Sequence, residues 1–534
     1  MKLSGIEICA SSLLLLCVWE CVSYGVNGGT DAGLVLLRVM PCVAAGIFSW
    51  AVFTAFGGKA EAMAEGAVAV LLLYESVLGM LQLCGLRASG HIIYPMTGTF
   101  SNPGPYGGLL AVLVSITGVS AIRHSGDKGI AGRILCILTG VSAASGLILL
   151  PASMSRTAWC SFLAAGLLWL SGRKEVRGFV SGRKWVVPAA VLSLLVLSVL
   201  IFNMKRESAE GRLHIWKMEA LAIADRPLYG YGPGNAMGAY GARQAEYFRE
   251  ADRPSSERKA AGCPEYPFNE YFRFGLECGV PGLVLSVLVM LAGIASLHGG
   301  GSSMAYGLTA WAVFAVASYP LSEEIPRYVL AVMLGAACAD GGIGRRTLLI
   351  VPAVALASIA LIWTAPRMRE RKDAEKRWQT ERQFSAFGID EGVADSLALL
   401  YDVLRDDYRY LYDYGHALHK SGMYAVSTEV LREGAAMSCD PMFHNIIGRN
   451  LEAEGRVEEA CGEYLQSHYM VPSRIYPLYL LMRCRVRAGD NEGAVRVGRE
   501  ISRMEVNPKV LTMKSLRKEA MELQDSLLIL MFAE

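Results

Sequence analysis

Long runs of apolar residues recur along the first two thirds of the 534-residue chain, separated by short polar turns. Each run has about 17–25 residues, which is the length that a helix needs to cross a bilayer. Backbone inside lipid must satisfy its own hydrogen bonds, and a helix does so within one segment. The sequence therefore predicts an all-α, polytopic helical membrane protein.

The apolar runs predict about eleven transmembrane helices. Their approximate bounds are 6–24, 33–56, 63–84, 105–122, 130–150, 157–171, 185–203, 276–297, 304–319, 328–341 and 347–365. Hydrophobic residues make up 53% of the chain and charged residues only 19%, as expected of a chain that lies largely in lipid. The first run follows Lys2 and lacks a cleavage site, so we expect a retained span rather than a cleaved signal peptide.

Lysine and arginine residues in the short connections set the expected orientation, because cytoplasmic loops carry an excess of both. Basic connections at 123–133, 173–184 and 345–346 fall on one side of an eleven-span chain. The first connection on the other side, SYGVNGGTD, has no Lys or Arg. We therefore expect a cytoplasmic N-terminus, with a large loop at about 204–275 and everything after Pro366 facing outward.

Charge and cysteine usage exclude several classes of protein. A formal net charge of +2 is far from that of a strongly basic nucleic-acid-binding domain. Most of the thirteen cysteines lie singly within apolar runs, with no CxxC pair and no His/Cys cluster at zinc-ligand spacing. The sequence predicts no disulfide framework, no metal site and no cofactor.

The chain becomes polar and helical in character after about residue 365. We expect a membrane domain at 1–365, a helical linker at 366–395 that begins with the charged stretch RMRERKDAEKRW, and a helical repeat domain at 396–534. A repeat array that faces outward would offer a surface to a protein partner or to an acceptor.

Small and aromatic residues in this last part recur with a period of about 34 residues. Gly415 and Gly448 take the small position in the first helix of successive units, while Ala425 and Ala460 take the one in the second. Each unit closes on a proline: Pro441, Pro472 and Pro508. The pattern resembles tetratricopeptide repeats, although the consensus Trp is missing and the third unit lacks the first-helix glycine.

Polar, glycine-rich segments stand out on the outward side of the expected topology. TGTFSNPGPYGG precedes the fourth span, and SMSRTAW precedes the sixth. The large loop contains GRLHIWK, DRPLYGYGPGN and PFNEYFRFGLECGVPG. All of these segments fall on the same side of the membrane, which agrees with the topology that the charges predict.

These segments, taken in order, resemble the O-antigen ligase and O-antigen polymerase superfamily of bacterial envelope glycosyltransferases. The matching pieces are G-T-F-x-N-P, S-x-S-R-x-x-W, G-R-x-x-x-W, D-R-P-L-x-G-x-G-P-G-N, and N-E-Y followed by G-x-x-G, over about residues 95–285. The resemblance implies transfer of a glycan, without metal or nucleotide, from an undecaprenyl-diphosphate carrier to an acceptor hydroxyl or amine. It also implies a place in the bacterial inner membrane, with the site on the periplasmic face.

Arg156 and Arg212 fall on two of these motifs. A guanidinium suits a diphosphate leaving group because it forms paired, charge-assisted hydrogen bonds. The structural alternative for Arg156 is a snorkelling anchor at the membrane surface. For Arg226, Arg243 and Arg273 a solvated loop charge is favoured.

Several small and polar residues of the motifs are expected to contact substrate. Gly230, Gly232 and Gly234 allow positive φ and close approach of backbone to a ligand, or form a plain turn. Asn102 and Asn269 either bind sugar hydroxyls or cap helices. The expected substrate-binding set is Asn102, Ser155, Gly232, Gly234, Asn235 and Asn269.

The chain departs from the family at Phe268, where family ligases commonly place a His before the Asn-Glu pair. His214 is one substitute, although a lone His on a loop helix is more often structural. Glu270 is another, provided that it reaches the acceptor, and a role in capping the eighth span is its alternative. Glu323 and Glu324 are further acidic candidates.

The motifs leave three acceptors open, namely lipid A core or another envelope lipid, a second lipid-linked repeat unit, and Ser/Thr of a secreted protein. A second class of function is a catalytically degenerate membrane scaffold that presents the repeats to an envelope partner, which the loss of the His favours. A transporter of lipid-linked sugars ranks last, because neither inverted repeats nor mid-membrane charges are evident.

Overall fold

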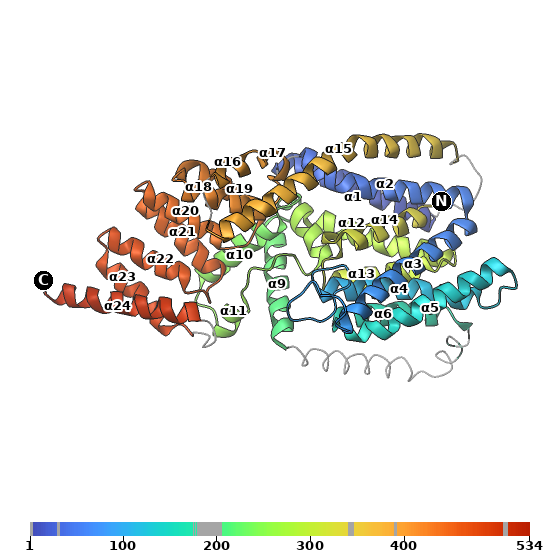
Figure 1. Ribbon diagram of the computed structural model, residues 1–534, viewed down its shortest axis with the longest axis horizontal. Helices are drawn as coiled ribbons and strands as arrows, with labels where there is room; N and C mark the ends of the chain where they lie inside the picture. The colour runs from blue at the N-terminus through green and yellow to red at the C-terminus, as the bar shows by residue number, and fades with distance from the viewer. Residues whose placement is uncertain are drawn as a thin grey trace. The chain divides into compact units, whose positions relative to one another are not determined.

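The computed structural model describes residues 4–28, 32–174, 176, 178, 206–339, 347–388, 392–505 and 511–533. Within these ranges the regular structure is helical throughout, with no strand (Figure 1). The chain divides into two compact units. The first holds the described residues of 1–22, 36–209 and 266–365, and the second those of 23–35, 210–265 and 366–534.

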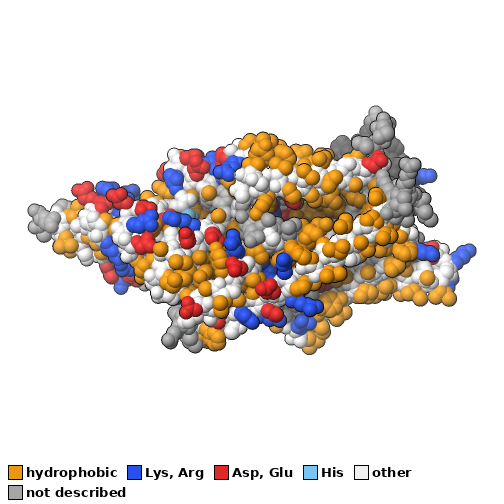
Figure 2. All heavy atoms as spheres, turned by 90° about the horizontal axis from the view of Figure 1, so that it is seen from above, with side chains coloured by type: hydrophobic (Ala, Val, Ile, Leu, Met, Phe, Trp, Pro, Cys, Tyr) orange, Lys and Arg blue, Asp and Glu red, His pale blue; other side chains and the backbone are white. Residues whose placement is uncertain are grey.

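The first unit is a bundle of apolar helices. Its members are α1 (Gly5–Asn27), α2 (Ala32–Phe56), α3 (Gly58–Leu83), α4 (Pro103–His124), α5 (Ile130–Ala152), α6 (Arg156–Ser171), α12 (Glu270–Gly299), α13 (Met304–Val316), the 3-10 turn η1 (Pro320–Ser322), α14 (Glu324–Ala337) and the first half of α15 (Thr347–Ala386). In Figure 2, hydrophobic side chains cover long stretches of the surface over these helices. Side chains that face lipid rather than water explain this outer surface.

Seven helices among the described residues are long and apolar enough to cross a membrane: α1, α2 from Val39, α3, α4, α5, α12 and α15 from Leu349. The protein is thus a multi-pass helical membrane protein. Three further expected spans coincide with the shorter helices α6, α13 and α14, and the one at 185–203 lies outside the described residues.

Helix α4 forms the centre of the bundle. In its most apolar window 78% of residues are buried, against 11–39% in the other six candidate spans. It packs on α3, α5, α6 and α13, and the largest fully buried side chains of the unit, Trp311 and Tyr106, lie in this core. The loop that precedes α4 is therefore anchored to the most buried helix of the unit.

The second unit is a run of amphipathic helices. It comprises α9 (Arg206–Asp225) from Glu210 on, α10 (Ala236–Glu250), α11 (Ser255–Ala260), the second half of α15, α16 (Val393–Ala398), α17 (Tyr401–Leu404), α18 (Tyr408–Lys420), α19 (Tyr424–Met437), α20 (Met442–Ala453), α21 (Val457–Met470), α22 (Tyr476–Arg487), α23 (Asn491–Arg503) and α24 (Leu511–Ala533). From α18 to α24 each helix packs on the next, so these helices form one continuous array.

Small buried residues let the helices of this array approach closely. A Cβ added to Gly415 would lie 2.5 Å from Leu431, and one added to Gly448 would lie 2.5 Å from Tyr464. At the equivalent position of the second helices the buried small residues are Ser427, Ala460 and Ala494. Ala425, which the sequence pattern placed in this position, is exposed, so the expected register was wrong by two residues. Ser427 fits because its hydroxyl donates to Gly415 O, 2.6 Å away.

Candidate functional site at the helix ends

The loop that carries TGTFSNP is held by two polar side chains of the membrane helix α3. Gln82 Oε1 accepts hydrogen bonds from Thr97 N at 2.9 Å and Gly98 N at 2.8 Å, and Gln82 Nε2 donates to Gly98 O at 2.9 Å. Glu75 accepts from Thr99 N at 3.2 Å and from Thr99 Oγ1 at 2.6 Å. The TGTFSNP segment thus has a structural role, because its first residues are the part of the loop that bonds to α3.

The clamped loop leads directly into α4. Asn102 is the N-cap of this helix, with its Oδ1 accepting from Gly104 N at 2.9 Å, and Pro103 follows at the first helical position. Tyr106 OH donates to Glu75 O at 2.9 Å, which ties the first turn of α4 to α3. The capping role that the sequence left open for Asn102 is therefore observed.

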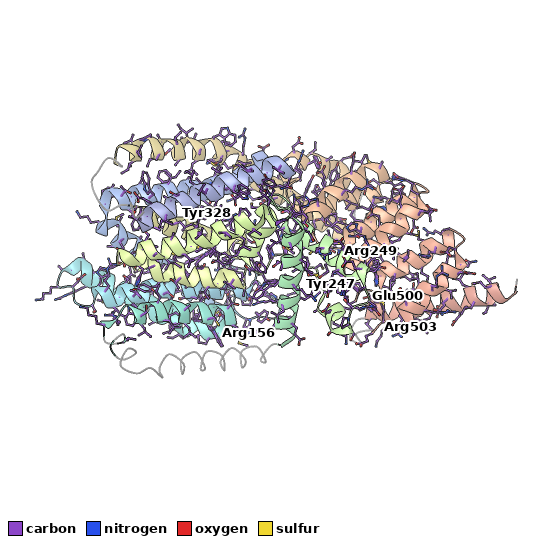
Figure 3. The ribbon with its side chains drawn as sticks, turned by 180° about the vertical axis from the view of Figure 1, so that it is seen from behind. Arg156, Tyr247, Arg249, Tyr328, Glu500 and Arg503 are labelled. Carbon is purple, nitrogen blue, oxygen red and sulfur yellow. The ribbon has the colours of Figure 1, made fainter. Side chains whose placement is uncertain are left out.

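The SMSR turn packs against the same first turn of α4. A Cβ added to Gly107 would lie 2.6 Å from Ser153 Oγ and 2.9 Å from Ser155 Cβ. Ser155 caps α6 by accepting from Ala158 N, and Arg156 is the first residue of that helix (Figure 3). Met154 has φ of 54°, the one positive value at a non-glycine residue in the described parts of the chain. Such backbone strain is typical of functional turns.

The PFNEY segment starts α12 close to these two helix starts. Asn269 caps α12 by accepting from Tyr271 N at 3.0 Å and Phe272 N at 3.2 Å. Tyr271 OH donates to Ala312 O near the end of α13, and Phe314 of the same turn packs against Gly108 of α4. The N-termini of α4, α6 and α12 thus gather around the C-terminus of α13, and we call this end of the bundle the motif end.

Phe268 belongs to an aromatic cluster at the motif end. Its ring meets the ring of Tyr319 edge-on, with centroids 5.5 Å apart. The ring of Tyr266 stacks on that of Tyr319, with centroids 4.4 Å apart. At the position where the resemblance implies a histidine, this chain has a phenyl ring that packs against Tyr319.

A cluster of charged side chains lies along the first two turns of α12. Arg273 Nε is 3.2 Å from Glu277 Oε1, and Arg273 Nη1 is 3.6 Å from Glu270 Oε2. Glu270 is 1% exposed, its Oε1 accepts from Leu321 N at 2.7 Å, and its Oε2 has no hydrogen-bond partner among the described residues. Glu20 of α1 also acts electrostatically on Arg273. Arg273 is therefore not the solvated loop charge that the sequence favoured.

The G-x-x-G part of this motif breaks α12. Gly279 has φ of 69° and ψ of −171°, and Pro281 follows within the same helix. The indole Nε1 of Trp19 donates to Cys278 O at 2.8 Å, so α1 satisfies a carbonyl at the break. Glu20, Glu277 and Trp19 were missed by the sequence analysis, although an acidic residue inside an apolar span is itself a signal of function.

A second buried ionic network lies at the opposite end of α4. Glu65 is fully buried and bonds Ser303 Oγ at 2.7 Å and His124 Nε2 at 3.0 Å, while Arg123 pairs with Glu61. This network joins the ends of α3, α4 and α13 away from the motif end. It fixes the bundle and is distant in the fold from the motif residues.

The glycine-rich segment YGYGPGN belongs to the second unit and forms a tight loop. Gly230, Gly232 and Gly234 have φ of 64°, 90° and 87°, which confirms the expected positive values. A Cβ on Gly232 would lie 3.0 Å from Gly28 O, so close backbone approach is already used within the chain. Asn235 Nδ2 donates to Tyr231 O at 3.0 Å.

The end of α1 that belongs to this unit fastens the same loop. Ser23 Oγ donates to Tyr229 O at 2.7 Å, and Asn27 Nδ2 donates to it at 3.2 Å. Exposed Arg226 places its guanidinium 4.7 Å from the centre of the Tyr231 ring. The loop is therefore a fixed element rather than a free connection.

His214 is packed inside the second unit. It is 5% exposed, its Nε2 lies 3.0 Å from Gln244 Oε1, and its ring stacks on Phe248. Burial lowers the pKa of His214, which keeps it neutral. Arg212 is half-buried two residues earlier on α9. These contacts give His214 the surroundings of a packing residue.

Two basic side chains of α9 and α10, Lys217 and Arg243, pair with carboxylates. Arg243 lies 3.1 Å from Asp225 and 2.8 Å from Glu246, so it is not a solvated loop charge either. Lys217 Nζ donates hydrogen bonds to Tyr247 OH at 2.7 Å and to Glu257 at 3.0 Å (Tyr247 is labelled in Figure 3). The hydrogen bond from Tyr247 lowers the pKa of Glu257. No group of three metal-ligating side chains occurs in the described part of the chain.

One comparison with known proteins matches a family, over part of the chain. Among solved structures, the "MamA RS-1 ArsTM double mutant" is similar over 33% of this chain and 90% of its own, with 17% identity and a TM-score of 0.24. No curated protein matches significantly. Residues 141–287 match the family model described as "O-Antigen ligase", which supports the O-antigen ligase superfamily and a ligase-type, glycan-transferring enzyme.

Proposed function

We propose that this protein transfers a glycan from an undecaprenyl-diphosphate carrier to an acceptor at the periplasmic face of a bacterial inner membrane. The observation that carries the proposal is the motif end, where three separate motifs place the N-termini of α4, α6 and α12 together. The family match over residues 141–287 includes two of these three motifs.

Arg156 is the residue to which we assign the diphosphate. A helix N-terminus attracts anions through its free N–H groups and its dipole, and α6 and α4 start side by side here. A guanidinium at the first position of α6 adds charge-assisted hydrogen bonds to the oxygens of the leaving group. Arg212 remains a second proposed catalytic residue, because the G-R-x-x-x-W motif falls on it.

The chemical step breaks the bond between the anomeric carbon and the phosphate oxygen, and forms a bond from that carbon to the acceptor oxygen or nitrogen. The diphosphate leaves with the electron pair, and the acceptor loses a proton. We assign this proton to Glu270, because Phe268 cannot accept it and one carboxylate oxygen of Glu270 has no hydrogen-bond partner among the described residues. His214 is then a positioning residue for α9 and α10.

The remaining motif residues are proposed substrate contacts, three in each compact unit. Asn102, Ser155 and Asn269 set the starts of the three helices, and Gly232, Gly234 and Asn235 form the fixed loop of the second unit. No metal is needed, because guanidinium groups and helix N-termini neutralise the leaving group.

The topology proposed is an N-terminus in the cytoplasm, about eleven spans, and a periplasmic C-terminal part. We divide the chain into a membrane domain (1–365), a linker (366–395) and a tetratricopeptide-like domain (396–534). The successive packing of α18 to α24 and the buried small residues at Gly415 and Gly448 support the repeat assignment. The array is proposed to bind a protein partner or the acceptor.

The alternative is a membrane scaffold without catalytic activity that presents the array to an envelope partner. The packing of Phe268 against Tyr319 favours it, because an aromatic cluster occupies the part of the motif where the family has its histidine. The two proposals differ in whether glycan appears on an acceptor.

Reconstituted transfer tests the choice. The protein in proteoliposomes would receive a lipid-linked oligosaccharide together with lipid A core, a second lipid-linked unit or a secreted protein. Transfer by the native protein, loss in Arg212→Ala and retention in Arg226→Ala would support the enzyme and identify the acceptor class. Absence of transfer to every acceptor, with the array still capturing a partner, would favour the scaffold.

A further inference from the structure

Two cysteines of the helical array lie in direct contact. Cys461 of α21 and Cys484 of α22 are 23 positions apart in the sequence, and their Sγ atoms are 3.2 Å from each other. A disulfide has an S–S distance of about 2.05 Å, so closure needs the two sulfur atoms to approach by roughly 1.2 Å.

We propose that Cys461 and Cys484 form an intramolecular disulfide that joins α21 to α22. The inference rests on the outward position proposed for the array, because structural disulfides persist in oxidising compartments such as the periplasm. It goes beyond glycan transfer, since it concerns the covalent structure of the array.

The surroundings of the two thiols give them different roles. Cys484 is fully buried, whereas Cys461 is half-buried and accessible to another molecule. The hydrogen bond that Cys484 shares with Cys461, together with the nearby charge of Arg485, lowers the pKa of Cys461. A thiol with a lowered pKa and partial exposure is the one that attacks a disulfide.

The oxidant is a protein disulfide of the oxidising compartment. The Cys461 thiolate attacks one of its sulfurs, forming a mixed disulfide, and the second sulfur leaves as a thiolate that takes up a proton. Cys484 then loses its proton to water and attacks Cys461 Sγ, which releases the first oxidant sulfur as a thiolate that takes up a proton from water. Two cysteines are oxidised, and the oxidant is reduced to a dithiol.

Other close cysteines of the chain differ in their surroundings. Cys9 and Cys338 have Sγ atoms 3.7 Å apart, but Cys9 is buried in the membrane bundle, away from a soluble oxidant. Cys439 of the array donates its S–H to Pro264 O and is buried. Cys439 therefore provides a matched control within the same unit.

The test is alkylation of the full-length protein in membranes from aerobically grown cells. After denaturation without reductant, we expect Cys461 and Cys484 to resist a maleimide reagent, and peptide mass spectrometry to show them linked. In Cys461→Ser we expect Cys484 to become alkylated, whereas Cys439→Ala should keep the linkage. Reductant should lower the melting temperature of the native array by on the order of 5–10 °C and leave that of Cys461→Ser unchanged.

Full alkylation of both thiols in these membranes would overturn the proposal. Treating the purified protein with oxidised glutathione would then locate the error. Closure under that treatment would show that the outward position of the array is wrong, and continued alkylation would show that the thiols cannot meet. Glycan transfer measured on Cys461→Ser separates either failure from a failure of the proposed enzyme activity.

Discussion

The carboxylate of Glu75, on the membrane helix α3, accepts two hydrogen bonds from Thr99, one from the backbone N–H and one from the hydroxyl. A polar pair of this kind inside an apolar bundle fixes the loop that precedes the most buried helix, α4. The TGTFSNP segment in this loop is therefore a structural clamp, and its effect on the motif end is to hold the start of α4 in place.

Gly98 is the position where this clamp tolerates no side chain. Its φ is 57°, and an added Cβ would overlap the Tyr106 ring and lie 2.5 Å from Glu75 Oε2. We expect Gly98→Ala to destabilise the protein by about 2–3 kcal/mol, measured by thermal unfolding in detergent. Gly118→Ala, on α4 with nothing within 4 Å, should change stability little. Equal melting temperatures for the two variants would contradict the clamp.

The contact between α4 and the SMSR turn predicts that glycan transfer depends on Gly107. Gly107→Ala would press on Ser153 and Ser155, which set the position of Arg156. Because the overlap displaces the start of α6, we expect glycan transfer to fall by at least about 10-fold. The Gly118→Ala protein should transfer at the native rate, and native activity in Gly107→Ala would argue against this contact as part of the site.

In the charge cluster on α12, we expect a single substitution to destabilise the protein more than the matching double substitution. Arg273→Met leaves Glu277 with an uncompensated charge in a mostly buried position, which we expect to cost on the order of 1–3 kcal/mol. Arg273→Met combined with Glu277→Gln should recover part of that loss. Urea or thermal unfolding of both variants measures the difference, and a double variant no more stable than the single one would disprove the pairing.

His214 predicts a dependence of stability on pH. Because burial lowers its pKa in the folded protein, the unfolded chain binds more protons below its ordinary pKa of about 6.5. The contribution of His214 to the free energy of unfolding should therefore be constant above about pH 7 and fall as the pH drops through 6.5, by at most about 1.4 kcal/mol per pH unit. Burial lowers the pKa of His419 in the same direction, so it adds to the slope.

The variant His214→Gln separates the two contributions. It removes one titrating group, so the loss of stability between pH 7 and pH 5.5 should be smaller than in the native protein. An unchanged slope would show that His214 is not held neutral.

The sequence predicted the positions of the helices well, and it predicted the contacts between their side chains less well. Apolar runs placed the helices because their length and hydropathy decide the matter locally. Helix caps at Asn102, Ser155 and Asn269 follow from local chemistry and were partly anticipated. The positive φ of Gly230, Gly232 and Gly234 was likewise predictable, because glycine permits it.

Long-range pairing could not be predicted from the sequence. Gln82 and Glu75 look like isolated polar residues in a span until the fold brings Thr97–Thr99 beside them. The pairing of Arg273 with Glu277 depends on α12 being helical from Glu270 on. The sequence predicted a span only from about residue 276, so Arg273 was expected in the loop. Ala425 was misplaced because a period of about 34 residues does not fix the register to within two residues.

The measurement that tests the proposed site most directly is glycan transfer by Arg156→Ala compared with Arg173→Ala. Arg156 starts α6 at the motif end, whereas Arg173 follows the other end of the same helix, with its guanidinium 4.3 Å from the Trp169 ring (Figure 3 labels Arg156). We expect Arg156→Ala to lose at least about 100-fold in rate with unchanged folding, and Arg173→Ala to retain the native rate. Native transfer by Arg156→Ala would contradict the assignment of the diphosphate to the motif end.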